Sequence, residues 1–134
     1  MFGAFDVSTS ALSAQRVRLE TIASNIANVD SVLGPDGKPG AYRRLFPIFQ
    51  AQRTSEGGAG VSVKELREDM SPFLQKYEPW NKQAANDKGY VSYPNVDLST
   101  EYVNAMETTR AYEANVTAIE TTKSMMNATL RVMA

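Results

Sequence analysis

Two long segments without proline or glycine, one near each end of the chain, constrain the fold most. The first runs from Asp6 to Val29 and the second from Asp97 to Ala134. Because proline and glycine interrupt helices more than other residues do, segments of this length without either favour helix. We therefore predict two long helices with a different kind of structure between them.

Both segments also carry apolar residues at the spacing of a coiled coil. In the first, Phe5, Leu12, Leu19 and Ile26 fall seven residues apart. In the second, steps of four and three alternate from Ala105 to Met133 through Thr109, Tyr112, Val116, Ile119, Lys123, Met126 and Leu130, and the polar Thr109 and Lys123 interrupt the apolar seam. Asp97 is expected to cap the second helix, and Glu101 in its first turn is favourable to the helix dipole.

The length of the second helix indicates assembly. About 36 helical residues at about 1.5 Å each span roughly 54 Å, whereas a compact domain of this size is roughly 36 Å across. The helix is therefore expected to extend beyond its own domain, and its apolar stripe then needs other molecules to cover it. We expect both ends of the free subunit to be partly disordered.

The middle region is rich in turns and short strands. Residues 34–40 contain three glycines and two prolines, and residues 42–50 and 60–66 are typical of the two strands of a small hairpin. Pro47 restricts the first strand to an edge, or interrupts it. Residues 71–95 are expected to form an extended connection with at most one further strand at 90–93.

These patterns predict a mainly α fold. We expect the long N- and C-terminal helices to form a coiled-coil-like pair with a small β-rich or extended insertion between them. The corresponding segments are residues 1–30, 31–96 and 97–134.

Composition excludes several functions. The chain has no cysteine and no histidine, so disulfides, cysteine- or histidine-based catalysis and the usual zinc sites are excluded. Its 14 basic and 15 acidic residues leave no positive excess for nucleic acid. No apolar run approaches the roughly 20 residues of a membrane span, and the first residues do not resemble a secretory signal. Composition alone indicates a cytosolic protein. Because no catalytic site can be recognised in the sequence, we also expect that it is not an enzyme and uses no cofactor or metal.

Polar residues beside the first stripe allow two interpretations. Thr21, Ser24, Asn25 and Asn28 lie on one flank of the helix. Their side chains could hydrogen-bond across helices and set their register, or they could form a solvated face that ends in an asparagine cap. Elsewhere, the carboxylates of Glu65, Glu68 and Asp69 are interpreted as a solvated edge and not as an acid–base pair.

The segment Ala-Ser-Asn-Ile-Ala-Asn at 23–28, near the end of the first helix, resembles the signature of the bacterial flagellar rod and hook family. Further elements at 34–37, 89–91, 94–96 and 123–126 make the chain most similar to proximal-rod members. The sequence at 80–86 departs from the family pattern, so contacts of that loop cannot be carried over.

The resemblance implies a structural subunit of a torque-transmitting tube, with both terminal helices in its inner layer. It implies export through the flagellum-specific channel without a cleavable signal, and a place in the periplasmic rod of the basal body. The implied partners are copies of the chain itself, other rod proteins, and the rod-to-ring adaptor with the export gate and the membrane-ring region. Direct membrane insertion is not implied. The assembly interface is expected to use Phe5, Leu12, Leu19, Ser24, Asn25, Ile26, Asn28, Tyr112, Val116, Ile119, Met126, Leu130 and Met133.

Two rival functions stay open. One is another axial flagellar protein, such as a distal-rod or hook subunit, although the short middle region argues against it. The other is a soluble helical adaptor or chaperone that works as a closed oligomer, which would be a well-folded dimer at low concentration.

Overall fold

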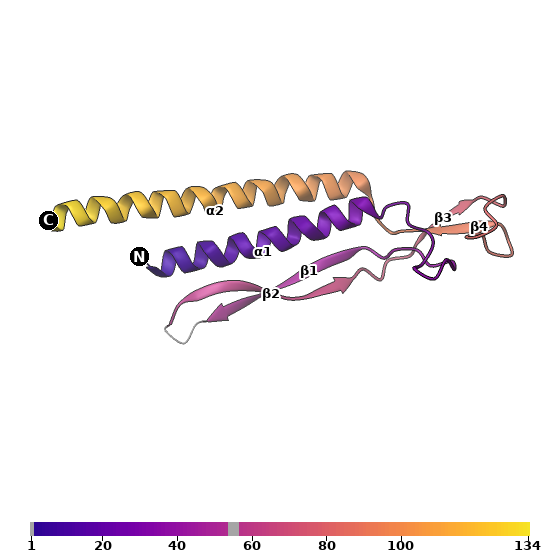
Figure 1. Cartoon of the computed structure of the whole chain (residues 1–134), viewed down its shortest axis with the longest axis horizontal. Helices are drawn as coiled ribbons and strands as arrows, with labels where there is room; N and C mark the ends of the chain where they lie inside the picture. Colours follow the sequence, from indigo (N-terminus) through magenta and orange to yellow (C-terminus); the bar gives the residue numbers. More distant parts are fainter. Residues whose placement is uncertain (1, 54–56) are drawn as a thin grey trace. The chain divides into compact units, whose positions relative to one another are not determined.

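The structure is a computed structural model that describes residues 2–53 and 57–134. Two terminal helices flank four strands (Figure 1). In chain order the elements are α1 (Phe2–Ala27), β1 (Leu45–Arg53), β2 (Ala59–Glu68), β3 (Leu74–Tyr77), β4 (Tyr90–Tyr93) and α2 (Leu98–Met133).

Both predicted helices are present, and α2 has close to its expected bounds, whereas α1 begins at Phe2, four residues before the predicted start at Asp6, and includes Gly3. The backbone N–H of Ser99 donates to the Asp97 carboxylate at 3.0 Å, which confirms Asp97 as the cap of α2. At the end of α1, the Asn28 side chain donates to the carbonyl of Ser24 at 2.8 Å. This bond satisfies one of the carbonyls that a helix end leaves unpaired.

Strands β1 and β2 form the predicted hairpin as a two-stranded sheet. Both strands of such a sheet are edges, so Pro47 in β1 interrupts no central ladder, as expected. In α1, the Ser10 hydroxyl accepts the backbone N–H of Val61 in β2 at 3.1 Å. A Cβ at Gly60 would lie 2.8 Å from that hydroxyl oxygen, so glycine allows the hairpin to approach α1 closely.

Strands β3 and β4 form a second small antiparallel sheet, in which Leu74 pairs with Tyr93 and Tyr77 with Tyr90. The sequence predicted β4 but not β3. All four β3 residues are exposed, so β3 lacks the alternation of buried and exposed side chains that would identify a strand. Cross-strand contacts stabilise it instead: the rings of Tyr77 and Tyr90 lie 5.3 Å apart, and Gln75 donates to the Ser92 hydroxyl at 2.9 Å.

The prediction of a mainly α fold built on a coiled-coil-like helix pair is wrong. The chain has two helices of 26 and 36 residues, but also two small antiparallel sheets. The heptad pattern did not reveal the sheets, because the most buried positions of α1 are Ala14, Thr21, Ile22 and Asn25. None of these four residues belongs to the predicted seam, and the hairpin covers part of the helix face that they form.

The chain divides into two compact units, and each takes residues from both helices. Unit 1 comprises residues 1–20, 47–66 and 105–134, and unit 2 comprises residues 21–46 and 67–104. Within unit 1, α1 lies between the hairpin and α2, and α2 extends past the start of α1 (Figure 1). The core of unit 2 includes Ile22, Ala84 and Val91 together with buried polar residues.

Candidate functional site

The most distinctive feature of unit 2 is a cluster of hydrogen-bonded polar side chains, which we call the polar junction. It consists of Asn25, Tyr42, Arg44, Asp69, Asn95 and Glu101. These residues come from the end of α1, the segment before β1, the end of the hairpin, the segment after β4 and the first turn of α2.

Asn25 binds the backbone of the first residue of β1. Its amide nitrogen donates to the Leu45 carbonyl at 2.8 Å, and its amide oxygen accepts the Leu45 N–H at 3.0 Å. The Tyr42 hydroxyl donates to the same oxygen at 2.9 Å. The side chain of Asn25, which is 1% exposed, thus acts as a strand partner and sets the position of β1 along α1.

Glu101 is the largest fully buried side chain, with no exposed surface. Its carboxylate pairs with the guanidinium of Arg44, and the Asn25 amide lies 3.5 Å from its other oxygen. A buried carboxylate is tolerated only when it is paired and hydrogen-bonded. Glu101 therefore joins α2 to α1 and to the segment before β1, a role that its position in the first turn did not reveal.

Asp69 and Asn95 extend the junction. The Arg44 backbone N–H donates to the Asn95 side chain at 2.9 Å, and the Asn95 amide donates to the Asp69 carbonyl at 2.9 Å. Hydrogen bonds from the Ser71 hydroxyl and N–H lower the pKa of Asp69, and the positive charge of Arg44, 3.4 Å away, lowers it further. The Asp69 carboxylate is therefore held ionised.

The junction has the chemistry of a rigid joint. Its polar groups bind one another, and among the described residues no three Asp, Glu, His or Cys side chains could hold a metal ion together. Within the same residues, neither helix is long and apolar enough to cross a membrane. The arrangement can fix the positions of chain segments, which is a mechanical role.

The α1 residues of the expected assembly interface fall into two groups. Phe5, Leu12, Leu19 and Ile26 are half-buried. At about 100° per residue, this seam lies roughly 150° around the helix from the buried residues Ala14, Thr21 and Asn25, but only roughly 70° from the buried Ile22. Ser24, Asn25 and Asn28 instead make hydrogen bonds within the chain, where Ser24 lies 3.2 Å from the Tyr42 hydroxyl and Asn28 caps α1.

The α2 residues of the expected interface become more exposed toward the end of the helix. Tyr112, Val116, Ile119 and Met126 are half-buried, whereas Leu130 and Met133 are mostly exposed. In unit 1 the Glu107 carboxylate lies 3.6 Å from Arg18 of α1, and in unit 2 Glu101 contacts Asn25. Both contacts join the last part of α1 with the first part of α2. Neither contact involves the end of α2, where side chains stay exposed.

The residues predicted from the sequence did not include Tyr42, Arg44, Leu45, Asp69, Asn95 or Glu101 as members of a site. Charged and polar residues in loops ordinarily indicate solvent-exposed positions. The only available signal was the run Tyr-Arg-Arg at 42–44 directly before a strand, where two cations sit beside apolar residues. Nothing in one sequence pairs Arg44 with Glu101, which lies 57 positions away.

Comparison with known proteins identifies two matching family models. "Flagella basal body rod protein" matches residues 5–35, and "Flagellar basal body rod FlgEFG protein C-terminal" matches residues 87–132. These matches cover α1 with the segment after it, and β4 with nearly all of α2.

Several curated proteins named flagellar basal-body rod protein FlgC are similar over most of the chain. That of Escherichia coli O157:H7 is 48% identical over 94% of this chain and 92% of its own length. That of Bacillus subtilis is 39% identical over 98% and 97%, and that of Borreliella burgdorferi is 37% identical over 99% and 97%.

Proposed function

This chain belongs to the FlgC family of flagellar basal-body rod proteins and is a structural subunit of that rod; from this premise we propose that it assembles through the seams of its two terminal helices. The seams pack against copies of the chain and against other rod proteins. The product is a stiff tube that transmits torque, and the subunit has no catalytic role.

The observation that carries this proposal is the partial exposure of both seams. Leu12, Leu19, Val116 and Ile119 are each left half-buried by the chain itself. Covering the part of each side chain that remains exposed stabilises an interface by at most about 1 kcal/mol each, roughly a third of the 1.5–3 kcal/mol of complete burial. Because a tube repeats the same contact at every subunit, small gains at each seam add up to a stiff assembly.

The polar junction supports this function from inside the subunit. It joins the end of α1 and the start of α2 to the strands through hydrogen bonds that need no neighbour. A buried ion pair is satisfied only in a narrow range of geometry. We propose that the junction keeps this part of both helices in one arrangement, so that load on the helices reaches the strands without rearrangement.

We also propose where the subunit works and what it touches. The family implies the periplasmic part of the rod, reached through the flagellum-specific export channel. The rod-to-ring adaptor and the export gate, in the region of the membrane ring, are the proposed neighbours at one end. Deleting the gene and imaging basal bodies tests this place, because the rod should then stop at the membrane ring.

Substitution of the seams tests the proposed interface. We expect Leu19→Asp or Ile119→Asp to reduce incorporation into rods at least about tenfold, because each places a charge in an interface that repeats at every subunit. Basal bodies purified from a deletion strain that carries each variant measure this incorporation. Thr9→Asp and Ala118→Asp place the same charge at exposed positions on the same helices and should assemble normally. Normal swimming with Leu19→Asp or Ile119→Asp would refute the assigned seams.

A further inference from the structure

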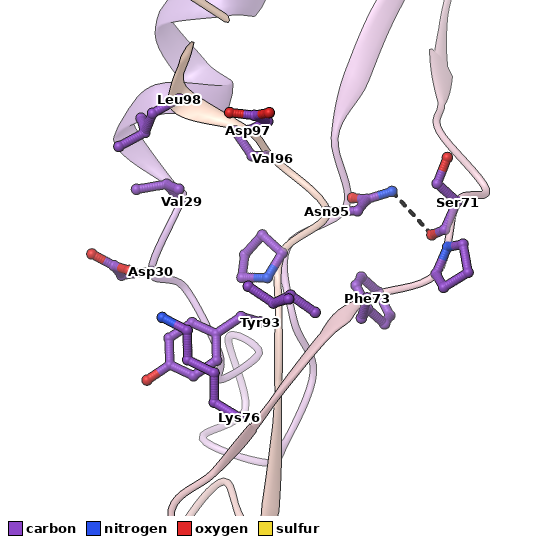
Figure 2. A pocket seen from close by; sticks show the side chains of 13 residues that line it. Val29, Asp30, Ser71, Phe73, Lys76, Tyr93, Asn95, Val96, Asp97 and Leu98 are labelled. Carbon is purple, nitrogen blue, oxygen red and sulfur yellow. Dashed lines mark hydrogen bonds between the residues drawn. The ribbon is translucent and has the colours of Figure 1, made fainter. Parts of the chain in front are cut away.

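A groove of about 670 Å³ lies within unit 2. Its apolar lining includes Val29, Phe73, Leu74, Pro94 and Leu98, and its charged lining residues are Asp30, Asp97 and Lys76. In Figure 2, Val29 and Leu98 lie at one end, and Lys76 and Tyr93 at the other. The groove is thus a largely apolar surface whose lining carries two carboxylates and one ammonium group, a net excess of one negative charge.

The polar groups around the groove already have partners. The Tyr93 hydroxyl hydrogen-bonds both oxygens of the Glu78 carboxylate at 2.9 and 3.0 Å, a contact that raises the pKa of Tyr93. The Lys76 ammonium lies 4.3 Å from the centre of the Tyr93 ring, and Asn95 donates to the Ser71 carbonyl at 3.1 Å (Figure 2). A polar small molecule would find few free donors or acceptors here.

Asp30 differs from these groups. Within residues 2–53 and 57–134 its carboxylate makes no hydrogen bond or ion pair, and it is exposed. An occupant that suits the groove is therefore apolar along its length and carries a cation that can reach Asp30.

The end of α2 has this chemistry. Residues 121–134 contain Lys123 and Arg131 but no acidic residue, whereas Glu101, Glu107, Glu113 and Glu120 precede them in the helix. Met125 and Val132, which are not part of the α2 seam, are more than half exposed. The helix end is thus apolar, basic and uncovered by its own chain.

We propose that the groove receives the apolar, basic end of the C-terminal helix of a neighbouring rod subunit, a segment of the kind that this chain carries at 121–134. This inference rests on the proposed function, because it requires neighbouring subunits in a tube. A contact between the end of one subunit and a groove of the next is heterologous, and such contacts build open helical assemblies rather than closed dimers.

Site-specific photo-cross-linking in assembled rods tests the proposal. The full chain, with a benzophenone amino acid in place of Leu74, is expressed in a strain that lacks the wild-type gene, and the linked peptide is mapped by mass spectrometry. We expect the link to fall within the last helical turns of a rod subunit. Leu66 is the matched control, since it is 49% exposed on β2 outside the groove, against 57% for Leu74, and it should not capture a helix end.

Charge reversal tests the same contact independently. Asp30→Lys should lower the yield of the Leu74 cross-link about two- to fivefold, the range expected for one exposed ion pair. Asp87→Lys, an equivalent change outside the groove lining, should leave the yield unchanged. If the Leu74 variant does not enter rods, Leu98 at the other end of the groove carries the cross-linker.

Three results would overturn the inference: a link to any other segment, no link in basal bodies that contain the variant, or a yield unaffected by Asp30→Lys. Each of these leaves the proposed function intact. The proposed function fails separately if purified basal bodies do not contain the wild-type chain.

Discussion

The polar junction of unit 2 is complete within one chain, whereas the end of α2 in unit 1 is left uncovered by its own chain. At the junction, buried polar groups satisfy one another inside one chain. At the end of α2, apolar side chains stay exposed. Directional bonds can define one geometry within a subunit, whereas non-directional apolar contacts can be completed by several different neighbours. The subunit therefore forms the hydrogen bonds of the junction alone, whereas assembly is needed to bury the apolar side chains at the end of α2.

Amide hydrogen exchange should show the largest difference between the two regions. In the free subunit, we expect the Leu45 amide, which is bonded to Asn25, to exchange at least about 10³-fold more slowly than amides of residues 127–133. In assembled rods the amides at the end of α2 should gain protection. Strong protection of the amides of residues 127–133 in the monomer would contradict the expected difference between the two regions.

Arg44→Met should cause the largest loss of stability. It leaves the fully buried Glu101 carboxylate without its cation, which costs about 3–5 kcal/mol of the free energy of unfolding. Urea denaturation measures this loss. Arg53→Met on the exposed end of β1 should change stability by less than about 0.5 kcal/mol. A cost for Arg44→Met as small as that of the control would mean that the junction does not stabilise the fold.

Asn25→Leu should cost somewhat less. Leucine has a similar size but leaves the N–H and the carbonyl of Leu45 without a partner, at about 1–2 kcal/mol each. The same denaturation experiment compares it with Asn127→Leu at an exposed position of α2, for which we expect little change. Equal stability of the two variants would show that water replaces the Asn25 amide.

The smallest expected effect is the pH dependence of Asp69. Its pKa in the folded chain lies below the ordinary value of 3.8, so the ionised form is stabilised by folding. That contribution is present above pH 3.8 and is lost as the pH falls through the lower, folded pKa. The difference in urea midpoint between the wild type and Asp69→Asn should therefore disappear in acid.

The two helices, the cap at Asp97, the hairpin and strand β4 could be predicted from the sequence, because each depends on neighbours a few positions away. Strand β3 could not, since all its residues are exposed and only its pairing with β4 defines it. The mainly α prediction failed for a related reason. Ser10 and Gly60 form a close contact between α1 and the hairpin, but small residues give no periodic apolar signal.

The sequence by itself determined where α2 begins and where both helices end, and it gave the apolar periodicity of each helix, because capping and periodicity are local properties of the chain. Only the tertiary structure decided that Asn25 serves as the partner of a strand, that Arg44 neutralises Glu101, and that Ala14, Thr21 and Asn25 are buried on a face of α1 away from its seam. These outcomes depend on contacts between residues far apart in sequence, where geometry and desolvation determine which polar groups meet.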